Sequence, residues 1–446
     1  MFIRVIRGFI FPAVIDITLK KKLRIAINAQ IPLGSGTGGI ETVLRALTAP
    51  GRLDDGDEEY VFIGHWSDPH WLRPFLGERQ RTVSAPRPAE NKPAAAEIFK
   101  RSLGRLRPLA GKVKRVFAPQ AGADPMPTRI CVPFSDGFYE SLGCDVIHFP
   151  YQDYVYCRVP TVYNPHDLQH LHYPEFFSPE EIERREVVYP SACRAAETVV
   201  VASEFVKRDV VRNYGLAEDK VRVIAWAPPA TNLEKAAEDE SSLLPSKYEL
   251  PAAPFALYPA MTWEHKNHIR LLEAVAFLRE RENLRINLVC TGHKNAFWSN
   301  IERRLRELKL ETQVKFLGVV AHRELSALYL RAQFVIIPTL FEAASAPLFE
   351  AWQHNAAAAC SSVTSLPEQA ADGALLFNPF SVEEIAGALK RMTTDENLRR
   401  TLRAKGTRRL QDFSLERTAR AYRAVYRKVG GAVLSEEDVR ILSSSV

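Results

Sequence analysis

Two successive alternations of short apolar segments with helical patterns constrain the fold of this 446-residue chain more than any other feature. Short runs rich in apolar and β-branched residues predict buried strands, and apolar residues at helical spacing predict the helices between them. Strands that alternate with helices along a chain form a parallel sheet covered on both faces. The first half therefore predicts a doubly wound α/β domain. Its predicted strands are residues 23–28, 60–64, 145–149, 160–163, 198–202 and 220–224.

A break in composition separates the first alternation from the second. Residues 229–254 carry an acidic run and several prolines, which predict a linker between domains. A chain of this length exceeds one ordinary core, so two domains are expected in any case. The second set of predicted strands comprises residues 255–258, 285–290, 314–317 and 334–337. The expected organisation is an N-terminal extension (1–22), a first Rossmann-like domain (23–228), the linker (229–254), a second Rossmann-like domain (255–412), and a C-terminal helix and tail (413–446) that packs back on the first domain.

The composition is that of a soluble globular protein, with 46% hydrophobic and 25% charged residues. The net charge of +6 is modest and predicts no nucleic-acid partner. Six scattered cysteines lack the paired spacing of a zinc site, which predicts a reducing, cytoplasmic environment without a structural metal. No stretch reaches the roughly 18 apolar residues of a membrane span.

Residues 92–118 form a basic segment with apolar residues interleaved. Such a pattern suits peripheral contact with an anionic membrane on its cytoplasmic side. A solvated insertion is the alternative, and the sequence alone favours neither.

Glu342 and Glu350 stand eight positions apart, shortly after the predicted strand 334–337. Pro347 suits the first turn of a helix, which places Glu342 in the strand-to-helix loop and Glu350 about a turn inside the helix. Free backbone N–H groups at a helix N-terminus bind phosphate. Carboxylates beside an anion site suit a phosphorylated sugar, because the acids can hold hydroxyls while the amides hold phosphate. The alternative is that Glu350 is an ordinary acid of an early helical turn.

Three further positions lie at predicted strand ends or helix starts. His166 follows the fourth predicted strand, where an imidazole could hydrogen-bond sugar hydroxyls or move protons. Lys266 follows the first strand of the second half, where its ammonium could neutralise a leaving diphosphate, although a solvated lysine is the ordinary alternative. Gly39 ends a glycine-rich loop that matches the dinucleotide fingerprint, but the acid Asp54 precedes the second strand instead of ending it, so we reject a dehydrogenase. The glycines still let the backbone approach a ligand closely.

Taken in chain order, these segments resemble the family-4 retaining glycosyltransferases of the GT-B fold, in which two doubly wound Rossmann-like domains face each other across a cleft. The resemblance spans roughly residues 23–430. Each part is weak alone, and the ordered set is specific. The matching parts are Gly38-Gly39-Ile40-Glu41, His166-Asp167-Leu168, residues 173–178, residues 201–207, His265-Lys266-Asn267, residues 314–318, and Glu342 with Glu350.

The resemblance implies a retaining glycosyltransferase of polysaccharide biosynthesis that needs no metal or other cofactor. It would move a hexose, such as mannose or glucose, from a nucleotide diphosphate sugar to a glycan or lipid-linked acceptor, with the second domain binding the donor. The resemblance further implies that Glu350 holds the ribose hydroxyls of the nucleotide. Glu342 and the backbone N–H groups near Ala344 and Ser345 would face the transferred sugar and its phosphates.

Five more residues receive roles from the same resemblance. Lys266 would stabilise the departing diphosphate and His166 would contact the donor sugar, so both are expected to be catalytic together with the first glutamate of the pair. Gly39 would bring backbone to the phosphate. Gly318 and Val319 would line the pocket for the base.

Two departures from the family pattern matter. The family commonly has Glu-Gly-Phe-Gly after the strand, whereas this chain has Glu342-Ala-Ala-Ser345, so the loop must swing differently or lie farther from the sugar. The family often has an arginine where this chain has Met261. His265 is the candidate to replace it in donor binding, which would make donor binding pH-sensitive.

Three other functions fit parts of this pattern. A nucleotide-sugar 2-epimerase of the same architecture would act on the donor alone. A donor-binding homologue without turnover is favoured by the altered residues 343–345. A glycosidase that uses the glutamate pair is disfavoured, because its two carboxylates must face each other across a bond.

Overall fold

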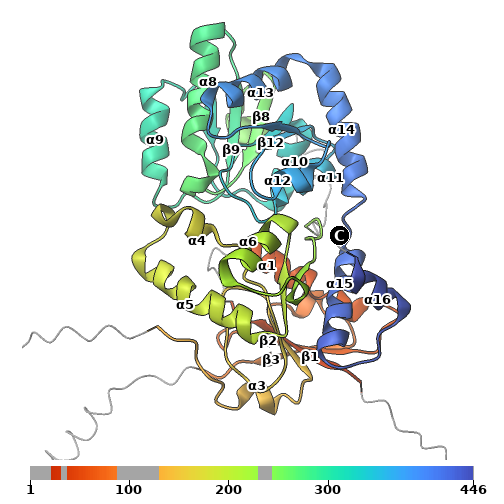
Figure 1. Ribbon diagram of the computed structural model, residues 1–446. Helices are drawn as coiled ribbons and strands as arrows, with labels where there is room; N and C mark the ends of the chain where they lie inside the picture. The colour runs from red at the N-terminus through yellow and green to blue at the C-terminus, as the bar shows by residue number, and fades with distance from the viewer. Residues whose placement is uncertain (1–21, 32–37, 88–129, 230–243, 445–446) are drawn as a thin grey trace, which may run out of the picture.

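The computed structural model describes residues 22–31, 38–87, 130–229 and 244–444. The predicted N-terminal extension, except for Lys22, and the basic segment 92–118 lie outside these residues, as does most of the predicted linker. Two α/β domains, one above the other in Figure 1, are built on two separate parallel sheets. The expected pair of doubly wound domains is therefore confirmed.

The first sheet has the strand order β3-β2-β1-β4-β5-β6-β7 in the described part of the chain. The order reverses between β1 and β4, and such a switch point is where doubly wound sheets bind ligands at their carboxyl ends. The inner strands are runs of fully buried residues, as expected for strands that are covered on both faces. The strands are β1 (Arg24–Ala29), β2 (Glu59–Gly64), β3 (Gln80–Ser84), β4 (Val146–Phe149), β5 (Thr161–Tyr163), β6 (Thr198–Val201) and β7 (Val221–Val223).

The second sheet has the order β10-β9-β8-β11-β12-β13 within the described residues. Its switch point falls between β8 and β11, which pair in parallel. The sequence correctly predicts four of these strands and gives no sign of β12 or β13. The strands are β8 (Phe255–Pro259), β9 (Asn287–Thr291), β10 (Val314–Phe316), β11 (Phe334–Ile337), β12 (Ala358–Ser361) and β13 (Leu375–Phe377).

Helices cover both faces of each sheet (Figure 1). On the first sheet, α1 and α15 pack on one face while α5 and α6 pack on the other. No helix in the described residues combines the length and apolar composition needed to cross a bilayer. The helices of the first part of the chain are α1 (Gly38–Ala46), α3 (Phe138–Ser141), α4 (Gln169–His172), α5 (Pro179–Ala195) and α6 (Glu204–Tyr214). Those that follow are α8 (His268–Glu282), α9 (Trp298–Glu307), α10 (His322–Arg331), α11 (Ala346–Gln353), α12 (Leu366–Ala370), α13 (Val382–Thr394), α14 (Glu396–Leu410), α15 (Leu415–Val429) and α16 (Glu436–Ser443).

Helix α15 returns from the second domain and packs on the first sheet through two buried tyrosines. The hydroxyl of Tyr426 lies 2.8 Å from Nδ1 of His148, and Nε2 of His148 lies 2.9 Å from the side-chain oxygen of Asn164. The amide of Asn164 donates to the hydroxyl of Tyr422 at 2.9 Å. Burial lowers the pKa of His148 to about 3, so the ring is neutral in this chain of bonds. The network ties α15 to the segment just before His166.

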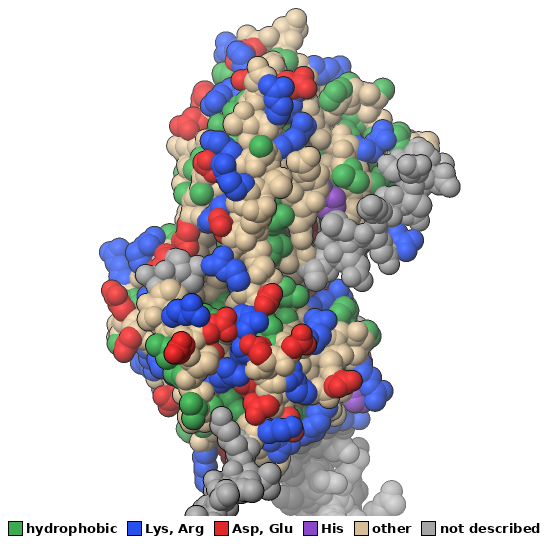
Figure 2. All heavy atoms as spheres, turned by 90° about the vertical axis from the view of Figure 1, so that its right-hand side faces the viewer, with side chains coloured by type: hydrophobic (Ala, Val, Ile, Leu, Met, Phe, Trp, Pro, Cys, Tyr) green, Lys and Arg blue, Asp and Glu red, His purple; other side chains and the backbone are tan. Residues whose placement is uncertain are grey.

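Ion pairs also hold α15 against the first domain. Arg423, whose side chain is almost fully buried, pairs with Asp55 at 2.6 Å, and Arg427 pairs with Glu58 at 2.6 Å. The hydrogen bond from Arg423 is the main cause that holds the pKa of Asp55 well below its usual range. Basic and acidic side chains are intermixed over the lower domain on this face (Figure 2).

Candidate active site

Lys266 and Glu342 meet at the switch point of the second sheet. Lys266 ends the short 3-10 helix η5 (Glu264–Lys266) after β8, and Glu342 lies in the loop after β11. The Lys266 ammonium lies 2.5 Å from Oε1 of Glu342, and the two side chains are 19% and 12% exposed. Two residues that the sequence separates by 76 positions therefore form a largely buried ion pair at a ligand-binding edge.

The loop that carries the lysine is fixed by its neighbours. Asn267 adopts the left-handed conformation with φ of 61°, which Asn tolerates better than most residues. Its side-chain amide donates to the carbonyls of Pro338 and Pro379, both at 2.9 Å. The carbonyl of His265 accepts from the backbone N–H of Leu340 at 2.7 Å. These bonds attach the loop after β8 directly to the loop after β11.

Glu350 projects from the second turn of α11 and is held by α10. The hydroxyl of Tyr329 donates to Oε2 of Glu350 at 2.6 Å, and the ring of His354 stacks on Tyr329 at 4.9 Å. Burial raises the pKa of Glu350 above its usual value, although the Tyr329 hydrogen bond acts in the opposite direction. The Tyr329 hydrogen bond therefore orients the Glu350 carboxyl before any ligand binds. Burial makes its ionised form costly unless a ligand supplies further hydrogen bonds.

The turn that replaces the family's glycines contradicts one expectation. The backbone N–H of Ser345 donates to Oε1 of Gln369 at 2.8 Å, so the prediction that this amide is free for a phosphate is wrong. The Ser345 side chain is buried, and its hydroxyl has no hydrogen-bond partner in the described residues. A buried hydroxyl without a partner is costly, so a ligand atom is a natural partner for it. Ala344 is partly exposed beside it.

His166 lies at the carboxyl end of the first sheet, in a strained conformation with φ of 66°. Its Nε2 lies 2.8 Å from the carbonyl of Pro150, which must accept, so Nε2 carries the proton and Nδ1 is left as an acceptor. Burial lowers the pKa of His166, which keeps the ring neutral. Because Pro150 follows β4, the bond brings His166 toward the switch point of the first sheet.

Gly39 stands at the start of α1, on the other side of that switch point, and is exposed. Among the described residues, a Cβ there would meet no atom within 4 Å, so none of them demands glycine at this position. In the second domain, Gly318 has φ of +73° and its carbonyl accepts from Gly292 at 2.8 Å. The neighbouring Val319 is 74% exposed at the carboxyl end of β10, two strands from β8.

His265 does not fit its predicted role as a pH-sensitive group. Burial, followed by the charge of Lys266, lowers the pKa of His265 well below its usual value. The ring therefore stays neutral around pH 7. It contributes through its backbone carbonyl and through a ring contact with Phe176 at 6.5 Å.

Aromatic side chains of the first domain cover the loop that carries Glu342. The ring of Phe341 lies 5.4 Å from His172, 6.2 Å from Tyr173 and 6.0 Å from Phe205. These three residues follow β5 and β6, so the carboxyl ends of the two sheets face each other. The contact joins the first domain to the residue next to Glu342.

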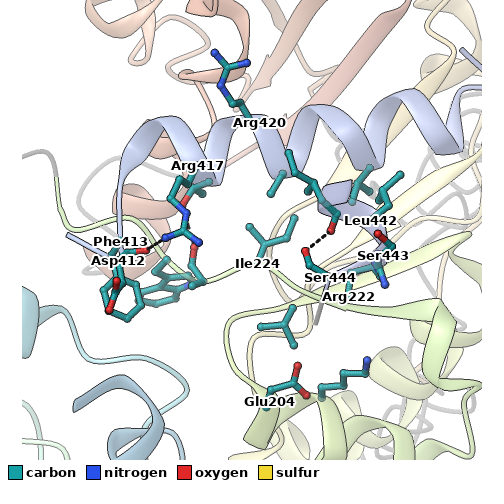
Figure 3. Close-up of a pocket in the computed structure, with 18 of the residues that line it drawn as sticks. Glu204, Arg222, Ile224, Asp412, Phe413, Arg417, Arg420, Leu442, Ser443 and Ser444 are labelled. Carbon is teal, nitrogen blue, oxygen red and sulfur yellow. Dashed lines mark hydrogen bonds between the residues drawn. The ribbon is translucent and has the colours of Figure 1, made fainter. Parts of the chain in front are cut away.

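A cavity of about 570 Å³ lies elsewhere, between β7, α15 and α16 (Figure 3). Its walls include Ile224 and Trp226 before the chain leaves the first domain, and Asp412 and Phe413 where it returns. None of the predicted site residues, all of which are described, lines it. The switch-point residues and this cavity are therefore separate features. Among the described residues, no group of three His, Cys, Asp or Glu is placed to hold a metal ion.

Sequence reasoning missed several residues that position the site. Asn267 and Tyr329 orient Lys266 and Glu350, and Gln369 holds the Ser345 peptide. Asn267 belongs to the His265-Lys266-Asn267 motif, but its structural role was not predicted; the partners of all three residues are distant in sequence. The one local signal is Pro367, which suits the first turn of a helix. It indicates that α12 begins shortly after β12, at the carboxyl edge of the second sheet.

Two doubly wound sheets that face each other through their carboxyl ends, with charged residues at the switch point, form the architecture expected of the GT-B fold. Residues 37–226 match Glycosyltransferase Family 4, and residues 245–409 match Glycosyl transferases group 1. The chain belongs to the family-4 glycosyltransferases, as the resemblance implied.

Curated relatives are distant. O-antigen chain mannosyltransferase B of Escherichia coli is 25% identical over 280 residues, which cover 60% of this chain and 72% of that protein. Serotype-specific mannosyltransferase WbdA of Escherichia coli is 27% identical over 293 residues, which cover 64% of this chain and 34% of that protein. The match thus spans about a third of the length of WbdA.

Solved structures support the same fold. Anabaena HepE in complex with UDP and glucose superposes with a TM-score of 0.63 at 15% identity, covering 91% of this chain and 100% of that one. Sucrose-phosphate synthase from Thermosynechococcus elongatus gives a TM-score of 0.61 at 20% identity, covering 92% of this chain and 100% of that one.

Proposed function

We propose that this glycosyltransferase moves a hexose, mannose in the first instance, from a nucleotide diphosphate sugar to a glycan or lipid-linked acceptor. The transfer retains the anomeric configuration and needs no metal ion. The observation that carries the proposal is the ion pair of Lys266 and Glu342 at the switch point. The choice of mannose rests on the mannosyltransferases among the relatives, and the nucleotide on neighbours solved with UDP.

The charges of this pair match the charges of sugar transfer. As the bond from the anomeric carbon to the diphosphate breaks, its electron pair stays with the phosphate and positive charge develops on the sugar ring. The Lys266 ammonium would stabilise the phosphate side, and the Glu342 carboxylate would face the ring and its hydroxyls. Interactions that strengthen as charge develops lower the barrier most. The ammonium supplies positive charge that a metal ion supplies in other enzymes.

The remaining site residues would bind the donor. Glu350, held by Tyr329, would accept hydrogen bonds from the ribose hydroxyls. The Ser345 hydroxyl would find its partner in the donor, and Nδ1 of His166 would accept from a sugar hydroxyl across the cleft. Closure of the domains over the Phe341 contact would exclude water and favour transfer over hydrolysis.

A membrane contact through residues 92–118, on the cytoplasmic side, stays part of the proposal. That segment lies outside the described residues. Liposome flotation with anionic and neutral vesicles tests it, and equal recovery with both would refute an electrostatic contact.

The test of the function is a thermal-shift panel of GDP-, UDP- and ADP-hexoses, followed by mass spectrometry of the reaction with candidate glycan acceptors. A bound donor raises the melting temperature by mass action. We expect one hexose to be added to the acceptor, with unchanged anomeric configuration by NMR. An epimer formed from donor alone would indicate the 2-epimerase instead, and binding without any product would indicate the non-catalytic homologue.

A further inference from the structure

Helix α12 holds the turn that carries Glu342. The side-chain amide of Gln369 makes two hydrogen bonds with the backbone of Ser345. It accepts from the Ser345 N–H at 2.8 Å and donates to the Ser345 C=O at 2.8 Å. Both residues are buried. A side-chain amide that bonds a backbone N–H and C=O together fixes the orientation of that residue as a neighbouring strand would.

The start of the turn is held by the same segment. The backbone N–H of Glu342 donates to the hydroxyl of Thr364 at 3.0 Å. The hydroxyl of Ser365 donates to the carbonyl of Glu342 at 2.8 Å. Residues 364–369 therefore hold the turn at both ends, and the Glu342 carboxylate projects from a backbone with little freedom.

The other side of α12 contacts the first domain. The carboxylate of Glu368 accepts the backbone N–H groups of Glu204 at 2.8 Å and Phe205 at 3.2 Å. These are the first two residues of α6, whose N–H groups have no partner inside the helix. A carboxylate at a helix N-terminus is favoured by the helix dipole. The contact between α12 and α6 is thus a hydrogen-bonded cap made by the Glu368 side chain, beside the ring contacts of Phe341.

Arg409 completes the support of α12. Its guanidinium donates to the carbonyls of Glu368 at 2.9 Å and Gln369 at 3.1 Å, and pairs with Asp412 at 2.7 Å. Asp412 lies where the chain returns to the first domain, and its carbonyl accepts from Arg417 of α15 (Figure 3). The helix is therefore bonded to the Glu342 turn, to α6 and to the returning chain.

We propose that α12 transmits the contact between the two domains to the Glu342 turn, with Glu368 and Gln369 as the positioning residues. When α6 is seated on Glu368, α12 is fixed and holds Glu342 opposite Lys266. When the domains separate, Glu368 loses its partners, and the turn that Gln369 holds becomes more mobile. The reactive geometry would then form only in the closed enzyme, where water is excluded. The proposal rests on the proposed function only in assigning this turn to the donor.

The direct test is hydrogen exchange of the ligand-free protein, followed by mass spectrometry with residue-level fragmentation. In Gln369→Leu, the Ser345 amide should exchange about tenfold faster, as expected for loss of its hydrogen bond. In Glu368→Ala, the amides of Glu204 and Phe205 should exchange faster, and so should that of Ser345. Glu368→Gln keeps one acceptor oxygen and should lie between wild type and Glu368→Ala. An unchanged Ser345 rate in Glu368→Ala would overturn the transmission.

Two matched variants control for general loosening. Gln313→Leu removes a buried glutamine that donates to Ile286 in the same domain at 3.1 Å. Glu384→Ala removes a carboxylate that accepts the Asn378 N–H at 3.0 Å within that domain. Neither should change the Ser345 rate, and a change equal to that of Glu368→Ala would also overturn the proposal.

The kinetic test uses the nucleotide sugar that shifts the melting temperature most. We expect Glu368→Ala to lower kcat about tenfold with a smaller change in KM, and Glu368→Gln to recover part of kcat. Wild-type kcat in Glu368→Ala would refute a positioning role. The exchange experiment needs no donor, so it separates failure of this proposal from failure of the proposed function.

Discussion

Replacing Lys266 by methionine removes the ammonium while keeping the length of the side chain. Glu342 then keeps a carboxylate that is only 12% exposed and has lost its ion-pair partner. A buried polar group without a partner costs about 1–3 kcal/mol, and the remaining exposure of the pair places the expected loss of stability in that range. The loss of positive charge at the leaving diphosphate should lower kcat by about 10²–10³-fold.

The double variant Lys266→Met/Glu342→Gln separates the two effects. A neutral amide is cheaper to bury than an unpaired carboxylate, so the double variant should regain most of the stability in urea denaturation. It should not regain kcat, because neither developing charge has its partner. A single variant as stable as wild type would show that the pair is not formed, and a kcat close to wild type in either variant would refute its catalytic role.

Three further predictions concern pH and the helix that returns to the first domain. The pKa of Glu350 is raised, and its ionised form would accept the ribose hydroxyls. Donor affinity should therefore fall as pH drops, with a midpoint above the usual pKa of a glutamate. Glu350→Gln should flatten this pH profile in calorimetric titrations. Tyr422→Phe leaves the Asn164 amide without its acceptor and should cost about 1–3 kcal/mol in urea denaturation; no loss would contradict the network. Burial lowers the pKa of His148 to about 3 in the folded protein, so as pH falls His148 is protonated in the unfolded chain before it is protonated in the folded protein. Stability should therefore fall as pH decreases from about 6.5 toward 3, and His148→Gln should reduce that slope in melts at several pH values.

The residues that the sequence identifies best are those at strand ends. Lys266 and Glu342 were predictable because parallel strands bring their carboxyl ends to one edge, whatever the distance along the chain. The buried apolar runs that mark β8 and β11 have no counterpart in β12, an alanine-rich strand of low β-propensity. The edge strand β3 is polar and only half-buried, so it lacks the same signal.

Contacts made by single side chains across the fold were beyond sequence reasoning. Gln369 reads as an ordinary helical residue, yet its amide removes the Ser345 N–H from the set of phosphate donors. The pairing of Tyr426 with His148 joins residues 278 positions apart. Such bonds depend on how elements that are distant in sequence pack within a domain, and no local pattern encodes that packing.

The most direct test of the account is hydrogen exchange with and without the nucleotide sugar that binds most tightly. Binding at the switch point of the second sheet predicts slower exchange in residues 264–268 and 340–350, with no effect in Lys266→Met at the same donor concentration. Protection found only around the cavity between β7, α15 and α16 would contradict the assignment of the active site. Sugar transfer without protection in residues 264–268 and 340–350 would contradict it as well.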